Sequence, residues 1–245
     1  MIKKAMILAA GLGSRLGEIT RNQPKALVKI DGVAMIDGLL FKLQNTGIEE
    51  VMINLHHHAD KIIAHIAANQ KLRMQIYFSD ESDILLDTGG ALVAAKAFFT
   101  GDSPILIHNV DILTNFDIKA LERFHQQKKA DATLFVSNRQ SSRALLFDIR
   151  NYLTGWANFK TSEFKWVDKP TADYLSFSFN GVWLTNPELI DRIKFTGKFS
   201  IIDAWLQLAS EQRLVGYVND KARWHDLGTP EKIRNAEDEL NLKTP

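Results

Sequence analysis

A glycine-rich turn and a lysine are the residues of this chain best suited to binding phosphate. Glycines at 11 and 13 leave room for backbone N–H groups to approach phosphate oxygens closely. Arg15 and Lys25 add fixed positive charge, and the segment between them contains Asn22-Gln23-Pro24, which indicates a loop that can fold over a triphosphate. The predicted nucleotide-binding residues of this segment are Ala10, Gly11, Leu12, Gly13, Ser14, Arg15 and Lys25.

Two aspartates, Asp111 and Asp226, follow short apolar segments and are candidate metal ligands. Open α/β sheets bind ligands at the carboxyl ends of their strands, and Mg²⁺ prefers oxygen ligands. A lone aspartate at a strand end more often caps a helix. The combination with a phosphate turn and a lysine favours a magnesium site, with Lys25 and Arg15 as the catalytic cations.

Glycines after a strand also occur in dinucleotide-binding turns, so an NAD-dependent oxidoreductase is an alternative. That fingerprint places a helix directly after the glycines and an acidic residue at the end of the second strand. Here the second predicted strand ends in Asn54 and Leu55 and is followed by His56. The spacing favours a nucleoside triphosphate over NAD.

The elements that position these residues alternate between apolar runs and segments of helical spacing, which is typical of an α/β fold. Ile36, Leu39, Leu40 and Leu43 form one helical face, which makes the flanking strands parallel. The expected strands are Ala5–Ala10, Glu50–Leu55, Gln75–Ser79, Ile105–Asn109, Ala132–Val136 and Arg143–Asp148. The expected further helices are Gly89–Phe99, Asp117–Lys128, a segment from Ser200 to Leu208, and one from Thr229-Pro230 to about Leu240.

These elements predict a Rossmann-like, doubly wound and mostly parallel sheet. Between about Arg143 and Trp183 short β segments replace the helices, which indicates a small antiparallel insertion. We expect one domain over residues 1–245, with a nucleotide-binding part at about 1–115 and a part at about 116–245 that binds the acceptor and supplies the second metal ligand.

Composition limits the partners. The chain has 245 residues, a formal net charge of +1 and no cysteine. A near-neutral chain gives no sign of binding nucleic acid or a membrane surface, so the partners are expected to be small molecules. The apolar run Ala5–Ala10 is too short for a signal peptide or a membrane span. We therefore expect a cytoplasmic protein that is a monomer or a weak homo-oligomer.

Taken together, these motifs resemble the sugar nucleotidyltransferase superfamily, whose hallmark is Leu-Ala-(Ala/Gly)-Gly-x-Gly-x-Arg followed by Pro-Lys-(Ala/Pro)-Leu. The resemblance continues through Asp87-Thr88-Gly89-Gly90, Asn109-Val110-Asp111, Asn180-Gly181 and the run from Trp224 to Thr229. It is strongest to short, single-domain uridylyltransferases and guanylyltransferase-like members. Gly17-Glu18-Ile19 and Val110 depart from the usual pattern.

The resemblance implies the nucleotide-diphospho-sugar transferase fold and direct, Mg²⁺-dependent transfer of a nucleotidyl group to a sugar 1-phosphate with release of pyrophosphate. It also implies that Thr88 and Gly89 lie beside the nucleotide. The positions implied to face the acceptor are Asn109, Lys169, Asn180 and Gly181. Asp168-Lys169-Pro170 is similar to a Glu-Lys-Pro element of longer relatives, and a surface hairpin lysine is the other interpretation.

Ala9-Ala10 resembles the uridylyltransferase members and favours UTP as the nucleotide substrate. Two other functions stay open beside this one. A cytidylyltransferase for phosphocholine would need aromatic side chains such as Trp156 and Trp166 around the quaternary amine. A non-catalytic nucleotide-sugar sensor would be expected to have lost the lysine or a metal carboxylate. The adjacent histidines His56-His57-His58 are interpreted as a solvated loop.

Overall fold

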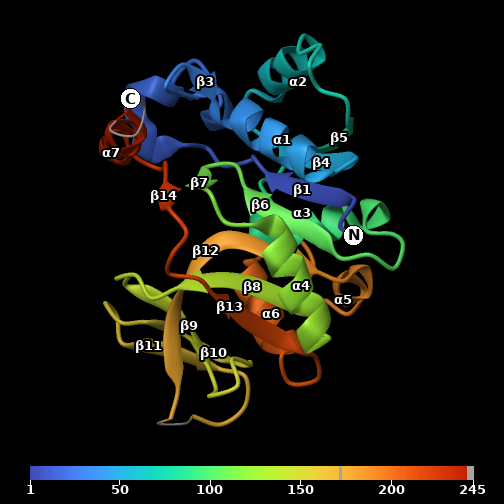
Figure 1. Cartoon of the computed structure of the whole chain (residues 1–245), viewed down its shortest axis with the longest axis vertical. Helices are drawn as coiled ribbons and strands as arrows, with labels where there is room; N and C mark the ends of the chain where they lie inside the picture. Colours follow the sequence, from blue (N-terminus) through green and yellow to red (C-terminus); the bar gives the residue numbers. More distant parts are fainter. Residues whose placement is uncertain (171–172, 242–245) are drawn as a thin grey trace. The chain divides into compact units, whose positions relative to one another are not determined.

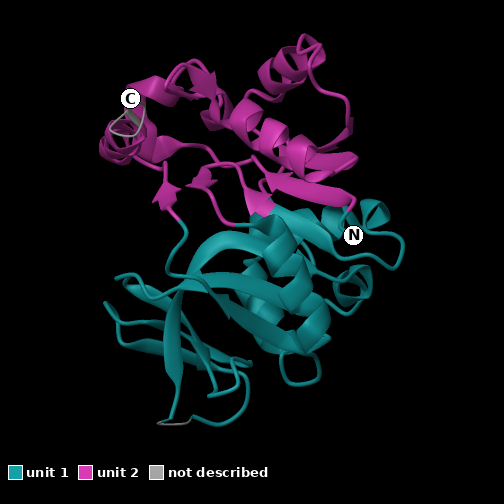
Figure 2. Ribbon diagram, in the orientation of Figure 1, with its two compact units in different colours: residues 1–2, 86–107, 117–222 teal, residues 3–85, 108–116, 223–245 magenta. Residues whose placement is uncertain are grey.

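The computed structural model describes residues 1–170 and 173–241. It divides into two compact units (Figure 2). Unit 1 comprises residues 1–2, 86–107 and 117–222, and unit 2 comprises residues 3–85, 108–116 and 223–245. Each unit is assembled from separate stretches of the chain.

The sheet of unit 2 is parallel (Figure 1). Its strands β1 (Lys4–Leu8), β4 (Glu50–Leu55) and β5 (Gln75–Asp80) pair in that order. β1 and β4 are largely buried apolar runs, as expected for strands covered on both faces. Their carboxyl ends therefore share one edge, from which the glycine-rich turn departs.

Helices connect these strands as crossovers. α1 (Met35–Thr46) buries the predicted apolar face and ends at Gly47, whose φ of 95° is left-handed. α2 (Ala59–Ala67) follows β4 and buries Ile62 and Ile66. A tight hairpin, β2 (Lys29–Ile30) and β3 (Val33–Ala34), precedes α1.

A second small sheet in unit 2 joins distant parts of the sequence. β7 (Ile112–Thr114) pairs antiparallel with β14 (Trp224–Asp226). α7 (Pro230–Asn241) follows, with proline at its first position, where a missing N–H costs no helical hydrogen bond. This pairing brings the C-terminal segment back to the residues after β6 (Ile105–Asn109).

The strands of unit 1 are mainly antiparallel. β12 pairs with β8 and β9, β9 pairs with β10, and β10 pairs with β11, whereas β13 runs parallel to β8. The bounds are β8 (Ala132–Ser137), β9 (Arg143–Phe147), β10 (Leu153–Asn158), β11 (Glu163–Trp166), β12 (Leu175–Thr185) and β13 (Leu214–Val218).

Helices and aromatic side chains complete unit 1. α4 (Ile118–Lys128) packs on β8 and β13, and α3 (Asp87–Ala94) packs on α6 (Ile201–Leu208) (Figure 1). α5 (Pro187–Asp191) follows β12, and a 3₁₀ turn, Lys96–Phe98, follows α3. Trp183 and Trp205, each 1% exposed, meet edge to face at a centroid distance of 5.3 Å.

The predicted α/β class, the parallel first strands and the antiparallel insertion are confirmed. Side chains cap two of these helices: the Asp117 side chain accepts from the Lys119 N–H and the Ser200 side chain from the Ile202 N–H. The predicted helix Gly89–Phe99 was misplaced, because α3 begins at Asp87 and ends at Ala94.

Two further expectations were wrong in part. The first strand ends at Leu8 rather than Ala10, because the Ala9 N–H donates to the Asn54 side chain. The expected loop after Gly13 contains 3₁₀ turns over Ser14–Thr20, broken at Gly17. None of the described helices combines the length and apolar character needed to cross a bilayer.

Candidate functional site

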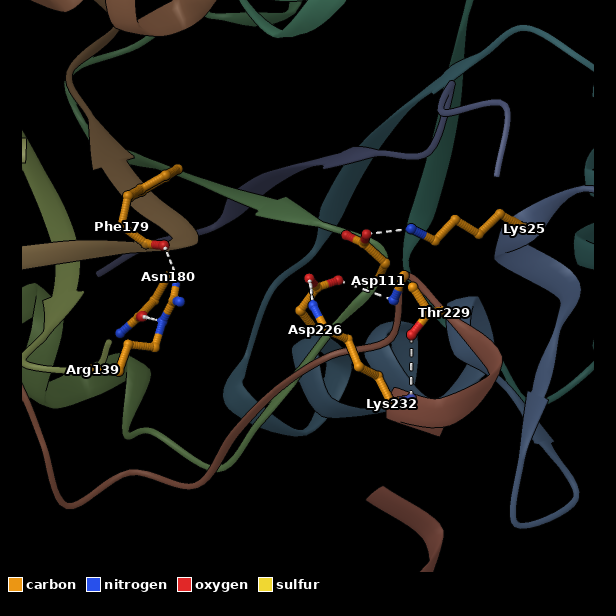
Figure 3. A network of polar contacts seen from close by, with 9 residues as sticks. Lys25, Asp111, Arg139, Phe179, Asn180, Asp226, Thr229 and Lys232 are labelled. Atoms are coloured by element: carbon orange, nitrogen blue, oxygen red, sulfur yellow. Dashed lines mark hydrogen bonds and ion pairs between the residues drawn. The ribbon is translucent and has the colours of Figure 1, made fainter. Parts of the chain in front are cut away.

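The two predicted metal ligands lie in neighbouring positions of unit 2. In the β14–β7 ladder Asp226 is paired with Ile112, the residue after Asp111, and the Leu227 N–H donates to the Asp111 carbonyl oxygen at 2.8 Å. Figure 3 shows both carboxylates in the same close-up. The fold thus brings together two acids from distant parts of the sequence.

Lys25 is the direct partner of Asp111. Its ammonium group forms an ion pair and hydrogen bond with the Asp111 carboxylate (Figure 3). Pro24 enters a 3₁₀ turn, Lys25–Leu27, that turns Lys25 inward, where it is only 8% exposed. Burying an ammonium group requires such a partner, so the predicted catalytic lysine is held in place by the predicted metal ligand.

Asp226 is surrounded by positive charge. Lys232, in the first turn of α7, pairs with its carboxylate (Figure 3). A methyl group on Gly228 would lie 2.7 Å from both Arg15 Nη2 and Asp226 Oδ1, so this glycine admits the guanidinium group. Burial alone would raise the pKa of Asp226, but the Lys232 hydrogen bond and the charges of Lys232, Arg15 and Lys25 lower it.

The glycine-rich turn is anchored at both ends. At its start, the Ala9 N–H donates to Asn54 Oδ1 at 2.7 Å, and Asn54 Nδ2 donates to Glu81 Oε1 at 2.8 Å. At its end, Gly13 has a left-handed φ of 66°, and its carbonyl oxygen accepts from the Thr20 hydroxyl at 3.0 Å. The exposed middle of the turn, at Gly11 and Leu12, therefore lies between two anchored ends.

The two carboxylates of Asp111 and Asp226 suit Mg²⁺ better than a metal ion whose ligands all come from the protein. Within residues 1–170 and 173–241, no cluster of three or more His, Asp or Glu side chains could hold a metal ion. Mg²⁺ is commonly bound by one or two carboxylates together with water and substrate phosphates. Asp111 and Asp226 supply such a pair, and the lysine ammonium groups now compensate their charge.

Asn109 is the predicted acceptor residue that belongs to unit 2. It ends β6, two residues before Asp111. Its side-chain oxygen is buried and has no hydrogen-bond partner in the described part of the chain. Because an unpaired buried amide oxygen is costly, a bound ligand could supply the missing donor.

Asn180 and Gly181 belong to unit 1, at an irregularity of β12. The register of β12 against β8 shifts between Phe179 and Trp183, and Gly181 has a left-handed φ of 75°. Asn180 is fully buried, and its side-chain oxygen accepts from the Ser137 hydroxyl at 3.0 Å. It also accepts from Arg139 Nε at 3.2 Å (Figure 3). The bulge thus holds a buried amide beside a guanidinium group.

Thr88 and Gly89, also in unit 1, take part in packing. The Thr88 hydroxyl accepts from the Ile201 N–H at 2.9 Å. A methyl group on Gly89 would lie 2.3 Å from the Phe199 ring. Neither Asp87 nor Thr88 is the N-cap residue of α3, which is Leu86. Close packing of α3 against Phe199 accounts for the glycine, and a nucleotide role for this segment stays a prediction.

The remaining candidates are Lys169 and the three adjacent histidines. Lys169 is exposed beyond β11, and the residues at 171 and 172 lie outside those described. The loop interpretation of the histidines is confirmed, although only His57 is exposed. Sequence reasoning missed Lys232 and Arg139. Lys232 could have been noticed from its place in the first turn after Thr229-Pro230, whereas nothing in the sequence marks Arg139.

Comparison with known proteins agrees with this geometry. A family model described as nucleotidyl transferase matches residues 4–242. N-acetylmuramate alpha-1-phosphate uridylyltransferase of Caulobacter vibrioides is 30% identical, over 97% of each chain. Mannose-1-phosphate guanylyltransferase 1 of Arabidopsis thaliana is 25% identical over 99% of this chain and 67% of that protein.

Solved structures show the same fold. UDP-glucose pyrophosphorylase from Acinetobacter baumannii superposes with a TM-score of 0.79 at 16% identity, over 100% of this chain and 95% of that one. At that identity the likeness concerns the fold alone. The family match over residues 4–242 and the 30% identical relative show that this chain belongs to the nucleotidyl transferase family of enzymes.

Proposed function

We propose that this enzyme transfers a uridylyl group from UTP to a sugar 1-phosphate, with Mg²⁺ as cofactor, and releases pyrophosphate. The observation that carries the proposal is the cluster of Asp111 and Asp226 with Lys25, Lys232 and Arg15 in unit 2. Its three cations outnumber its two carboxylates, so it suits a polyanionic ligand. The relative from Caulobacter vibrioides, matched over 97% of each chain, is named a uridylyltransferase.

In the proposed reaction an oxygen of the acceptor phosphate attacks the α-phosphorus of UTP in line, and the bond from that phosphorus to the pyrophosphate oxygen breaks. Lys25, Arg15 and Lys232 stabilise the charge that develops on phosphoryl oxygens. Backbone N–H groups of the anchored turn position the nucleotide. Mg²⁺, held by Asp111 and Asp226, would neutralise charge on the phosphates.

The acceptor side of the proposal rests on Asn109, Asn180, Gly181 and Lys169. Amide groups can bind sugar hydroxyls as donors or acceptors, and the unpaired Asn109 oxygen is suited to accept from one. In unit 1, the bulge at Gly181 and the Arg139 guanidinium group hold the Asn180 amide. These contacts support a polar acceptor such as a sugar.

A cytidylyltransferase for phosphocholine is less well supported. A quaternary amine would need an open aromatic face. The Lys165 ammonium lies 5.5 Å from the centre of the Trp156 ring, and Trp166 stacks on Phe164 at 6.0 Å. The Lys165 ammonium thus already lies over the Trp156 ring, and the Phe164 ring covers a face of Trp166.

The test is a matrix of the four nucleoside triphosphates against a panel of sugar 1-phosphates and phosphocholine, with pyrophosphate release as readout. We expect UTP with a sugar 1-phosphate to give the highest kcat/KM, and EDTA to abolish turnover. Preference for CTP with phosphocholine would replace the proposal by the cytidylyl alternative. Absence of pyrophosphate release in every combination would refute it.

A further inference from the structure

Unit 2 contains a cavity that the proposed reaction does not use. It has a volume of about 250 Å³. A cavity of about 150 Å³ already holds benzene, so this one admits a body of roughly eight to ten non-hydrogen atoms. Most of its wall is aliphatic, including Val33, Met35, Leu39 and Ile112. A ligand that fills it must be largely apolar.

Two polar side chains in the wall are incompletely satisfied. The Lys42 ammonium donates to the Thr114 carbonyl oxygen at 2.7 Å and lies 4.6 Å from the centre of the Phe116 ring. No carboxylate of residues 1–170 or 173–241 forms an ion pair with it. His108 is 1% exposed, and its Nε2 has no hydrogen-bond partner among those residues.

The charges around the cavity select its occupant. Burial, which removes water from the ammonium group, lowers the pKa of Lys42 to about 8. Burial and the charge of Lys42 lower the pKa of His108 to about 3, so His108 is neutral and Lys42 supplies the positive charge. The exposed Asp31 also lines the cavity and repels additional negative charge, so the single Lys42 ammonium matches one carboxylate better than a multiply charged phosphate.

Three residues of the cavity wall are sequence neighbours of the proposed metal ligands. Val110 and Ile112 flank Asp111, and Leu227 follows Asp226, and all three line the cavity. The hydrogen bond from Leu227 to Asp111 joins these two wall segments. An occupant would therefore press on the backbone that carries both carboxylates.

We propose that this cavity binds a small monocarboxylic acid with an apolar body, whose carboxylate pairs with Lys42, and that its occupancy changes the magnesium dependence of the enzyme. The binding step does not depend on the proposed function. The coupling step does, because it is read from turnover.

The binding test uses octanoate, 1-octanol and octylamine in calorimetric titrations of the full chain. We expect octanoate to bind at least tenfold more tightly than octanol, and octylamine more weakly than either. In Lys42→Met, whose side chain keeps its apolar stem, the preference for octanoate over octanol should vanish. The matched control is Lys128→Met, since Lys128 also lies over a phenylalanine ring, Phe124 at 5.7 Å, but is exposed and outside the cavity.

A second variant blocks the space without removing a charge. Gly38 lines the cavity, and a methyl group there would meet only Val33 Cγ1, at 4.0 Å. Gly38→Leu should therefore fold and lose both octanoate and octanol. No octanoate binding by the wild type at millimolar concentration, or equal binding by Lys42→Met, would overturn the site.

The coupling test measures turnover against Mg²⁺ concentration with and without saturating octanoate. We expect at least a twofold change in the magnesium concentration at half-maximal rate in the wild type and none in Gly38→Leu, which cannot bind octanoate. Binding without this change would overturn the coupling and leave the site. Absence of any turnover would count against the proposed function, while the titrations would still decide the site.

Discussion

The backbone N–H of Leu227 donates to the carbonyl oxygen of Asp111 at 2.8 Å, and this bond joins two segments that are far apart in sequence. It sets the register of β14 against β7 and places Asp226 beside the residue that follows Asp111. The pair of carboxylates is therefore a product of backbone pairing. Substitutions that keep the side-chain shape should leave this geometry intact.

Asp111→Asn and Asp226→Asn should each lower turnover by about 10²–10³-fold, because each removes one preorganised charge from the site. Both variants should also need more Mg²⁺ for half-maximal activity. Steady-state kinetics against magnesium would show this. Asp191→Asn, at an exposed aspartate paired with Lys96, is the control and should behave as the wild type. Near-normal turnover in both site variants would discard the metal assignment.

Lys25→Met should separate turnover from metal affinity. We expect kcat/KM to fall by about 10²-fold or more, since the ammonium would no longer stabilise developing charge. Magnesium affinity should stay equal or increase, because Lys25 no longer competes for the Asp111 carboxylate. Magnesium titrations of turnover test both, with Lys96→Met as the exposed control. A parallel loss of metal affinity would argue that Lys25 only holds Asp111 in place.

The two glycines of the turn should respond differently to alanine. Gly13 has a φ of 66°, and a methyl group there would lie 3.0 Å from Thr20 Cγ2, so Gly13→Ala should cost about 1–2 kcal/mol of stability. A methyl group on Gly11 meets nothing within 4 Å. Gly11→Ala should therefore keep its stability within about 0.5 kcal/mol but bind UTP at least tenfold more weakly. Unchanged UTP affinity would remove Gly11 from the nucleotide site.

Gly89 and Gly90 should matter for packing in unit 1. A methyl group on Gly90 would lie 2.2 Å from the Gly197 carbonyl oxygen, and one on Gly89 would lie 2.3 Å from the Phe199 ring. Backbone yields less readily than a side chain, so Gly90→Ala should cost about 3 kcal/mol and Gly89→Ala about 1 kcal/mol. Urea unfolding tests this order. The reverse order would show that the Phe199 ring cannot move.

The parallel strands and the glycine-rich turn could be predicted from sequence because each rests on local patterns. Buried apolar runs indicate β1 and β4, and Gly47 marks the end of α1. The register that joins Asp111 to Asp226 could not be derived in this way. It depends on two strands of three residues each, whose pairing is fixed by tertiary contacts.

Other features depend on packing that no local pattern records. α2 was missed because its buried face consists of only two isoleucines, Ile62 and Ile66. The partners of Asn180 arise from a bulge that brings Ser137 and Arg139 to it. The cavity beside Lys42 is likewise a property of the folded chain, since its lining comes from separate segments.

Stability should decrease below neutral pH because of His108. Burial first, and the charge of Lys42 second, lower its pKa from 6.5 to about 3, so the unfolded state binds the proton more tightly. The contribution of His108 is complete above pH 6.5 and is lost as the pH falls from 6.5 towards 3, at up to about 1.4 kcal/mol per pH unit. Burial also lowers the pKa of His125, which acts in the same direction.

Urea unfolding at pH 7 and pH 5 tests this contribution. The wild type should lose about 2 kcal/mol of stability at pH 5 because of His108, and His108→Leu should show a smaller loss than the wild type. An equal loss in both proteins would mean that the pKa of His108 is the same in the folded and the unfolded state.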